Sequence, residues 1–310
     1  ITPSITPTIS LTPSITPTIS VTPSITPTNT PTVTPTTTPI NRVNRALFNA
    51  SNLSNVGTNG GPSYYGTFDQ SGLVYEWTDT TLTTQKVTRG GNYASTNVVT
   101  LSIATRLGLG GLDAGVGFRV GAKTGLFTSR IPLVDIIDRS NSNHSSGFGR
   151  VDYLYKISKF LITNAQYVDF LNSIAATDTH SVFYASSQIQ STGGILRFGS
   201  SGSYTYVCKP DMANRPINYV TWHSAARYCN WLHNNTPTGS QDASTTEDGA
   251  YTLSGSTLVD RNVNANYYLP SEDEWVKAAY YNGTDYFTYA TQSDVAPTAV
   301  SVGSDGDGVF

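Results

Sequence analysis

Apolar residues recur at helical spacing in residues 216–233, directly behind a residue that can cap a helix. Thr221 can accept a hydrogen bond from the free amides of a first helical turn, so a helix is predicted to begin there. The apolar positions form one stripe, made of Trp222, Ala225, Ala226, Cys229 and Leu232. The opposite side is polar and contains His223, Ser224, Arg227, Asn230 and Asn234. We therefore expect an amphipathic helix that is buried on its apolar side.

Two further helices are predicted from capping boxes. In the pairs Thr163 with Gln166 and Ser271 with Glu274, each side chain can satisfy a backbone amide of the other residue at a helix start. The second helix is expected over 272–281. The first helix would bury one apolar face, formed by Tyr167, Phe170, Leu171 and Ile174.

Short β-prone runs lie before and between these helices. They are residues 74–77, 98–109, 117–121, 131–137, 151–162 and 204–208. Glycines separate several of them, and residues 89–93 (Arg-Gly-Gly-Asn-Tyr) are predicted to form a tight turn. Residues 42–62 and 282–310 are predicted to be loops.

The first forty residues alternate in a different way. Every even position from 2 to 38 is Ser or Thr, and the odd positions are nearly all Pro, Ile, Leu or Val. Frequent proline excludes a β-strand, because each proline lacks an amide donor and fixes φ near the polyproline value. The sequence therefore predicts an extended rod of about 120 Å, at about 3.1 Å per residue. We call residues 1–41 the stalk.

Tracts rich in Ser, Thr and Pro are typical of O-glycosylated stalks. Sugars on the alternate hydroxyls would cover the exposed Ile, Leu and Val side chains. The alternative is an unmodified flexible spacer. The candidate glycosylation sites are Thr2, Ser4, Thr6, Thr8, Ser10, Thr12, Ser14, Thr16, Thr18, Ser20, Thr22, Ser24, Thr26, Thr28, Thr30, Thr32, Thr34, Thr36 and Thr38.

Composition narrows the function classes. Charged residues make up 13% of the chain, well below the roughly one quarter that is typical of soluble domains. The formal net charge of −3 argues against a nucleic-acid-binding surface, which would need a basic stripe. No apolar run approaches the roughly 20 residues of a membrane span. The single methionine is internal (Met212), which favours a processed N-terminus.

Three segments resemble the formylglycine-generating-enzyme (sulfatase-modifying factor) domain family. They are residues 162–172, 216–232 and 269–279, which include Ile162-Thr163-Asn164-Ala165-Gln166-Tyr167 and Leu269-Pro270-Ser271-Glu272-Asp273-Glu274-Trp275. The resemblance implies an α+β domain with a C-type-lectin-like fold. Residues 65–69, 72–77, 89–93 and 117–120 resemble motifs from the C-terminal half of that family, yet here they come first.

This order implies a circular permutation. After the stalk (1–41), the resemblance implies a C-terminal half of the family domain (42–122), a connector (123–149) and an N-terminal half (150–310). We expect residues 117–121 to pair near residues 155–162, because permutation requires old chain ends that lie close together. In the alternative, residues 46–122 complete a neighbouring chain and produce a head-to-tail polymer.

The family's oxidase members use two cysteines after the Arg-Gly-Gly turn, but residues 92–106 of this chain contain none. The two cysteines present, Cys208 and Cys229, cannot form a metal site alone. We expect them to form a disulfide that closes a loop of about 20 residues, worth about 3 kcal/mol. Two buried free thiols are the alternative.

Other candidate chemistry is weak. The four histidines do not have the spacing of an iron site with two His and one carboxylate, so no metal site is predicted. The carboxylates at 272–274 would complement a helix dipole rather than form a catalytic cluster. Asp305-Gly306-Asp307-Gly308 could contribute to a Ca²⁺ loop, although the rest of a ligand set is missing. No other cofactor is expected.

The sequence therefore favours a non-enzymatic, extracellular structural or adhesive protein at a cell or virion surface. We expect a repeating subunit of a glycosylated fibre or of a phage or viral appendage, with other copies of itself and covalent glycans as partners. The alternative is a lectin-like module that binds a glycan or a receptor. An oxidase-type enzyme ranks third, because the required cysteines are absent.

Overall fold

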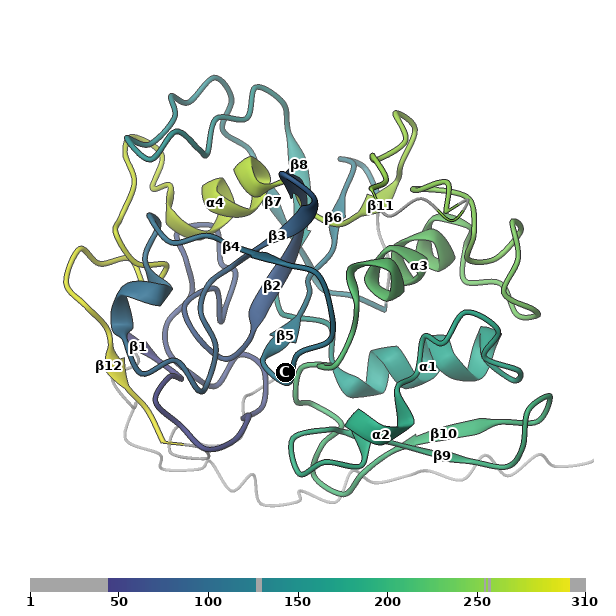
Figure 1. Ribbon diagram of the computed structural model, residues 1–310. Coiled ribbons are helices and arrows are strands. Elements are labelled where there is room, and N and C mark those ends of the chain that lie inside the picture. Colours follow the sequence, from purple (N-terminus) through teal and green to yellow (C-terminus); the bar gives the residue numbers. More distant parts are fainter. Residues whose placement is uncertain (1–43, 127–129, 254, 256–257, 302–310) are drawn as a thin grey trace, which may run out of the picture. The chain divides into compact units, whose positions relative to one another are not determined.

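The computed structural model describes residues 44–126, 130–253, 255 and 258–301, which fall in one compact unit (Figure 1). The stalk, with all its candidate glycosylation sites, lies outside the described residues. The candidate Ca²⁺ segment 305–308 also lies outside them.

The predicted helices are present and begin at the predicted caps. Helices are α1 (Asn164–Ile174), α2 (Ala185–Gln188), α3 (Trp222–His233) and α4 (Glu272–Tyr280), with a 3₁₀ helix η1 at Val98–Leu101. Both capping boxes form, and the Thr221 side chain accepts a hydrogen bond from the Ser224 amide. The local sequence signals are therefore sufficient to place these helix starts.

Within the described ranges, two four-stranded sheets and two strand pairs accompany the helices, so the predicted α+β class is confirmed. One sheet has the order β4-β3-β2-β5, formed by Leu107–Leu109, Gln85–Arg89, Tyr75–Leu82 and Val116–Gly117. The other has the order β11-β6-β8-β7, formed by Tyr267–Tyr268, Gly121–Ala122, Tyr155–Ser158 and Leu133–Ile136. The pairs are β9-β10 (Ile195–Phe198, Thr205–Cys208) and β1-β12 (Arg45–Ala46, Thr298–Ala299).

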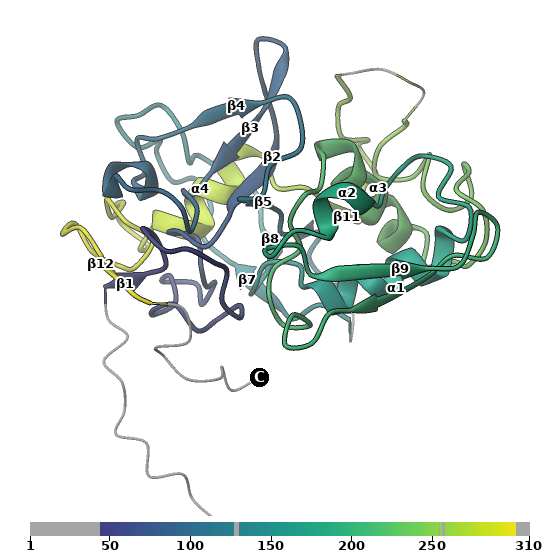
Figure 2. The same ribbon diagram turned by 60° about the horizontal axis from the view of Figure 1, so that its bottom comes forward.

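The helices and strands form two groups that lie side by side. In Figures 1 and 2, α4 lies with β2, β3 and β4 on one side, while α1, α2, α3 and the β9-β10 hairpin lie on the other. The largest core cluster fills the second side and includes Phe118, Phe170 and Tyr228. The ring centroids of Phe118 and Tyr228 are 5.4 Å apart, and those of Phe170 and Tyr228 are also 5.4 Å apart. Aromatic packing thus joins α1 and α3 to the segment that precedes β6.

The predicted pairing of residues 117–121 with 155–162 is confirmed. Gly121 and Ala122 pair antiparallel with Ile157 and Lys156. Just upstream, the amide of Ile162 donates to the carbonyl of Phe118 over 3.0 Å. The earlier segment of the chain therefore completes the sheet of the later segment within one chain. The permuted order relative to other family members stays a prediction.

The structure differs from the sequence prediction in several places. Residues 98–101 form a 3₁₀ helix instead of a strand, because the Asn97 side chain accepts a hydrogen bond from the Val99 amide and caps a helical turn. The two predicted loops contribute one strand each, β1 and β12, which pair in parallel. The supposedly polar side of α3 is also largely buried: Asn230 is fully buried and its side-chain amide donates to the carbonyls of Thr246 and Tyr251.

Candidate functional site

The family-like motifs meet in a buried ionic core. Glu76 and Arg119 are both fully buried, and Arg119 Nη2 donates to Glu76 Oε1 over 2.8 Å. The indole nitrogen of Trp275, in α4, donates to the other oxygen of Glu76 over 2.8 Å. Each of these polar groups has a partner, as buried charges require. These motif residues therefore stabilise the fold and are not available to a substrate.

A second buried cluster surrounds Glu272 at the start of α4. Arg89 Nε donates to Glu272 Oε1 over 2.7 Å, and Arg106 Nη2 donates to Glu272 Oε2 over 2.6 Å. Arg89 also donates to the carbonyls of Ile103 and Thr105. The carboxylate of Glu272 is thus shared by two guanidinium groups. These contacts support the structural interpretation of residues 272–274.

Residues 92–106, where oxidase members of the family have their cysteines, are packed as structure. Leu101, at the end of η1, is fully buried. Two carbonyls of the same segment, Ile103 and Thr105, accept hydrogen bonds from Arg89, as described above. The segment therefore presents no thiol, and Arg89 holds part of its backbone in place.

The predicted disulfide between Cys208 and Cys229 is wrong, because both cysteines are free thiols. Helix α1 separates them: it packs on β10, which ends at Cys208, and it also contacts α3, which contains Cys229 (Figure 1). Cys229 is fully buried on the apolar stripe of α3, and this burial raises the pKa of its thiol. A buried, protonated thiol is unreactive, so Cys229 acts as a small core residue.

The described residues contain no group of three or more His, Cys, Asp and Glu that could hold a metal ion. The histidines have local roles. His233 Nδ1 accepts a hydrogen bond from the Asn266 amide over 3.0 Å, and His144 Nδ1 lies 2.9 Å from the Ser146 hydroxyl. His180 Nε2 lies 3.6 Å from a Glu247 oxygen.

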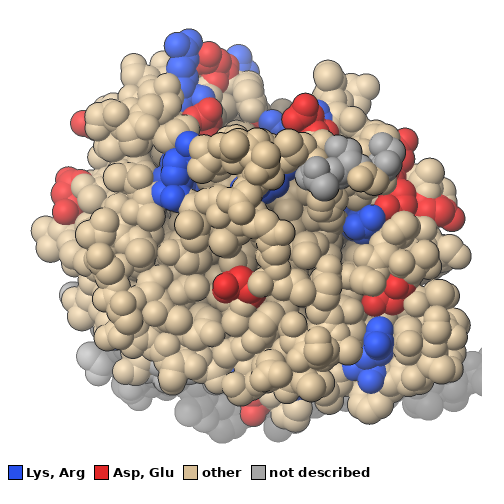
Figure 3. All heavy atoms as spheres, in the orientation of Figure 1, with Lys and Arg blue, Asp and Glu red and all other residues tan. Residues whose placement is uncertain are grey.

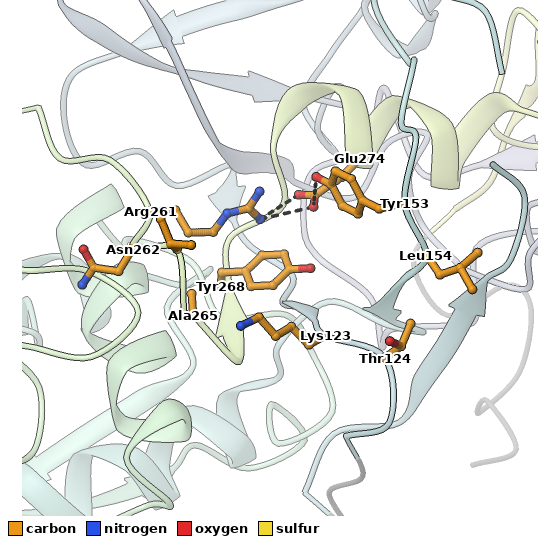
Figure 4. A pocket seen from close by; sticks show the side chains of 10 residues that line it. Lys123, Thr124, Tyr153, Leu154, Arg261, Asn262, Ala265, Tyr268 and Glu274 are labelled. Carbon is orange, nitrogen blue, oxygen red and sulfur yellow. Dashed lines mark hydrogen bonds and ion pairs between the residues drawn. The ribbon is translucent and has the colours of Figure 1, made fainter. Parts of the chain in front are cut away.

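One candidate binding site is a cavity of about 400 Å³ beside the β11-β6-β8-β7 sheet (Figure 4). We call it the Arg261 pocket. Its lining comes from three segments far apart in the sequence and consists of Lys123, Thr124, Tyr153, Leu154, Arg261, Asn262, Val263, Ala265, Tyr268 and Glu274. The cavity volume lies within the range of small-molecule sites, and its wall combines aromatic, apolar and charged groups.

The ion pair between Arg261 and Glu274 forms part of the wall of the Arg261 pocket. Arg261 Nη1 donates to Glu274 Oε2 over 3.0 Å, and the Tyr153 hydroxyl donates to Glu274 Oε1 over 2.8 Å (Figure 4). Burial lowers the pKa of Arg261, but the charge and hydrogen bonds of Glu274 outweigh this effect and raise the pKa above its ordinary value. The guanidinium carbon also lies 4.0 Å from the centre of the Tyr268 ring. Arg261 is therefore charged and held in one orientation.

Lys123 differs from the other charged groups of the pocket. It follows β6, it is exposed, and its ammonium group has no hydrogen-bond or ion-pair partner within the part of the chain that the structure describes. Glu274 is fully buried and has all its charge compensated by Arg261, Tyr153 and the Ser271 amide. The pocket mouth therefore has an excess of one positive charge.

A second cavity, of about 450 Å³, lies near the start of α3 and the tip of the β2-β3 hairpin. Its charged side chains already have partners. Arg227 donates to both oxygens of Glu247, each over 2.7 Å. Lys86 donates to the carbonyls of Asp79 and Val259. For this reason the Arg261 pocket, which keeps an unpaired cation, is the better candidate.

No motif or periodic pattern in the sequence predicts the Arg261 pocket. Lys123 is the first residue of the predicted connector, Tyr153 follows the end of that connector, and Arg261 lies in a stretch without periodic pattern. No spacing rule relates them, because only the pairing of β6 with β8 and β11 brings them together. The one available signal is the isolated cation Lys123, which lies two residues after the predicted strand 117–121.

Comparison with known proteins identifies the later part of the chain. The model of the sulfatase-modifying factor enzyme 1-like domain matches residues 149–308. No curated protein and no solved structure matches the chain. Among the described residues, no helix is long and apolar enough to cross a membrane. Residues 46–122 lie outside the family match, so their resemblance to the family stays a prediction. The chain belongs to the sulfatase-modifying factor enzyme 1-like domain family.

Proposed function

We propose that this protein is a non-enzymatic, extracellular structural or adhesive subunit, in which a glycosylated stalk presents the folded unit. The observation that supports this proposal best concerns residues 92–106. This segment contains no cysteine, and its apolar residue Leu101 lies in the core. Family membership does not by itself establish catalysis, because function resides in particular sites and not in folds.

The surface supports the same proposal. Figure 3 shows a face formed mostly by residues other than Lys, Arg, Asp and Glu, with a few scattered charges. Many of the charged side chains that the structure describes form buried ion pairs, such as Arg119 with Glu76 and Arg89 with Glu272, and so do not contribute to the surface. A surface of low charge leaves solubility to hydroxyl and amide groups, and to the sugars that we propose on the stalk.

The repeating-subunit form of this proposal uses the contacts between residues 46–122 and the later segments. In the structure these contacts form within one chain, through β6-β8 and the Glu76–Arg119–Trp275 cluster. If the same contacts formed between neighbouring chains, each copy would complete the next, and a contact that does not close on itself extends into a fibre.

The full chain, purified from a host that O-glycosylates secreted proteins, tests the proposal. We expect added hexose or N-acetylhexosamine mass on peptides from residues 2–38 and regular filaments by electron microscopy. A variant with Ala at every even position of 2–38 and in place of Thr37 is the control and should have no added mass on these peptides. Oxygen-dependent conversion of a cysteine-containing substrate peptide would contradict the proposal, and so would an undecorated, strictly monomeric chain.

The second candidate function is recognition of a glycan or receptor by the folded unit. The Arg261 pocket favours it, because a cavity of about 400 Å³ with a free cation is more than a monomeric structural subunit needs. An adhesive subunit and a binding module are compatible, since a fibre can also present a binding site at each repeat.

A further inference from the structure

The Arg261 pocket contains two kinds of surface. Tyr153 is 47% exposed and Val263 is 94% exposed, so part of the wall is apolar and accessible. Val263 and Tyr153 are, with Tyr64, Ile137 and Val295, among the large exposed hydrophobic residues of the chain. An apolar wall beside polar groups suits a sugar ring, which has C–H faces and a hydroxyl edge.

Some polar groups of the pocket already have hydrogen-bond partners, whereas others can still bind a ligand. Asn262 uses its side-chain amide hydrogens on the Gly249 carbonyl and the Thr252 hydroxyl, which leaves its oxygen as an acceptor. Arg261 Nη1 contacts Glu274, and the guanidinium group also lies close to the Tyr153 hydroxyl and to the Asp79 carboxylate. Together with the unpaired Lys123, these groups offer donors to an anion and an acceptor to a hydroxyl.

The net charge of the side chains that line the pocket indicates the class of ligand. Glu274 neutralises Arg261, and Asp79, which lies 3.9 Å from Arg261 Nε, also pairs with Lys86. Among the residues that line the pocket, Lys123 therefore supplies one positive charge without a carboxylate partner in the described part of the chain. A neutral sugar would leave this charge unused, and a phosphate monoester would bring more negative charge than the pocket balances. A single carboxylate matches it, and the fixed guanidinium edge can donate to one of the carboxylate oxygens.

We propose that the Arg261 pocket binds a carboxylated sugar residue, of the hexuronic-acid type, within a surface polysaccharide. Lys123 and the Arg261 guanidinium pair with the carboxylate, Tyr153 packs on the ring, and the Asn262 oxygen accepts from a hydroxyl. Arg261 needs no rearrangement to bind, because Glu274 and Tyr268 already hold it. The biological use of this site rests on the proposed adhesive function, but binding can be measured independently.

Calorimetric titration of the full chain with tri-galacturonic acid tests the site, with the trisaccharide's methyl ester as the neutral probe. We expect binding of the acid that weakens with added salt, and at least tenfold weaker binding of the ester. Lys123→Gln should weaken binding of the acid about tenfold, and Lys123→Arg should restore most of it. Arg139→Gln removes an exposed positive charge that does not line the pocket and should leave binding unchanged.

Three results would overturn the proposal: equal binding of the acid and its ester, no effect of Lys123→Gln, or tighter binding of a sulfated galactose trisaccharide, which would assign the pocket to sulfate esters. Lys123 is exposed, so an unchanged melting temperature should confirm that the variant folds. Loss of binding with intact glycosylated filaments would refute this site only. Binding without filaments or stalk glycans would refute the fibre and leave the site.

Discussion

The buried ionic core and the Arg261 pocket both contain an ion pair between an arginine and a glutamate, but only the pocket also has a charged group that can bind a ligand. In the core, Arg119 and Glu76 are fully buried and each has a fixed partner. In the pocket, Arg261 and Glu274 form a similar pair, but Lys123 beside them has no partner among the described residues. The residues of the family-like motifs therefore maintain the fold, whereas residues outside the motifs supply the groups that can bind a ligand.

The largest effect should come from breaking the core pair. Arg119→Met leaves the Glu76 carboxylate buried without its main partner, which should lower the free energy of unfolding by about 3–5 kcal/mol. The double variant Arg119→Met, Glu76→Met removes both charges and should recover much of this loss. Urea unfolding measures both values. If the single and double variants were equally unstable, packing and not charge would be the cause.

Asp79 lies between the two regions and gives the next effect. Its carboxylate oxygens lie 3.5 Å from Lys86 Nζ and 3.9 Å from Arg261 Nε. Burial raises the pKa of Asp79 to about 6, and the two cations offset this only partly. The folded state therefore holds the proton more tightly than the unfolded chain, so stability is lost as pH rises from about 4 through about 6.

Asp79→Asn should remove this loss. At pH 7.5 the variant is expected to be more stable than the wild type by up to about 3 kcal/mol, and below pH 4 the two should be similar. Thermal unfolding from pH 3.5 to 7.5 checks the difference. Parallel pH profiles for the two proteins would show that Asp79 does not titrate in this window.

Gly121 gives the smallest of the three effects and acts on the pocket. A Cβ atom added there would lie 2.5 Å from a ring carbon of Tyr268, the residue on which Arg261 stacks. Gly121→Ala should displace this ring, lower the free energy of unfolding by about 1–3 kcal/mol and weaken uronate binding. Gly111→Ala is the matched control, because nothing lies within 4 Å of a Cβ there. Equal stability of the two variants would contradict this account.

Sequence reasoning succeeded where the determinants are local. Thr163, Thr221 and Ser271 each cap a helix through a side chain three residues from its partner, so the helix starts could be predicted. It failed where a local signal competed with β propensity, as at Asn97, whose cap turns residues 98–101 into a 3₁₀ helix.

Tertiary contacts account for the other differences. Asn230 is buried because the loop containing Thr246 and Tyr251 covers the polar side of α3, which no helical pattern could reveal. The disulfide prediction failed because α1 lies between the two thiols. The family resemblance explains why the β6-β8 pairing was expected, but it gave no information on Lys123, Tyr153 and Arg261, which meet only in the folded chain.

The parallel pair β1-β12 has a mechanical consequence. Asn44 and Ala46 lie at the N-terminal end of the described residues. The Asn44 carbonyl accepts a hydrogen bond from the Thr298 amide, and the Ala46 carbonyl accepts one from the Val300 amide, each over 3.0 Å, so among the described residues these bonds would meet tension from the N-terminal side first. A two-residue strand pair offers few bonds to share such a load. If the chain were pulled from this side, we expect the β1-β12 pair to separate before the buried ion pairs of Glu76 and Glu272 break.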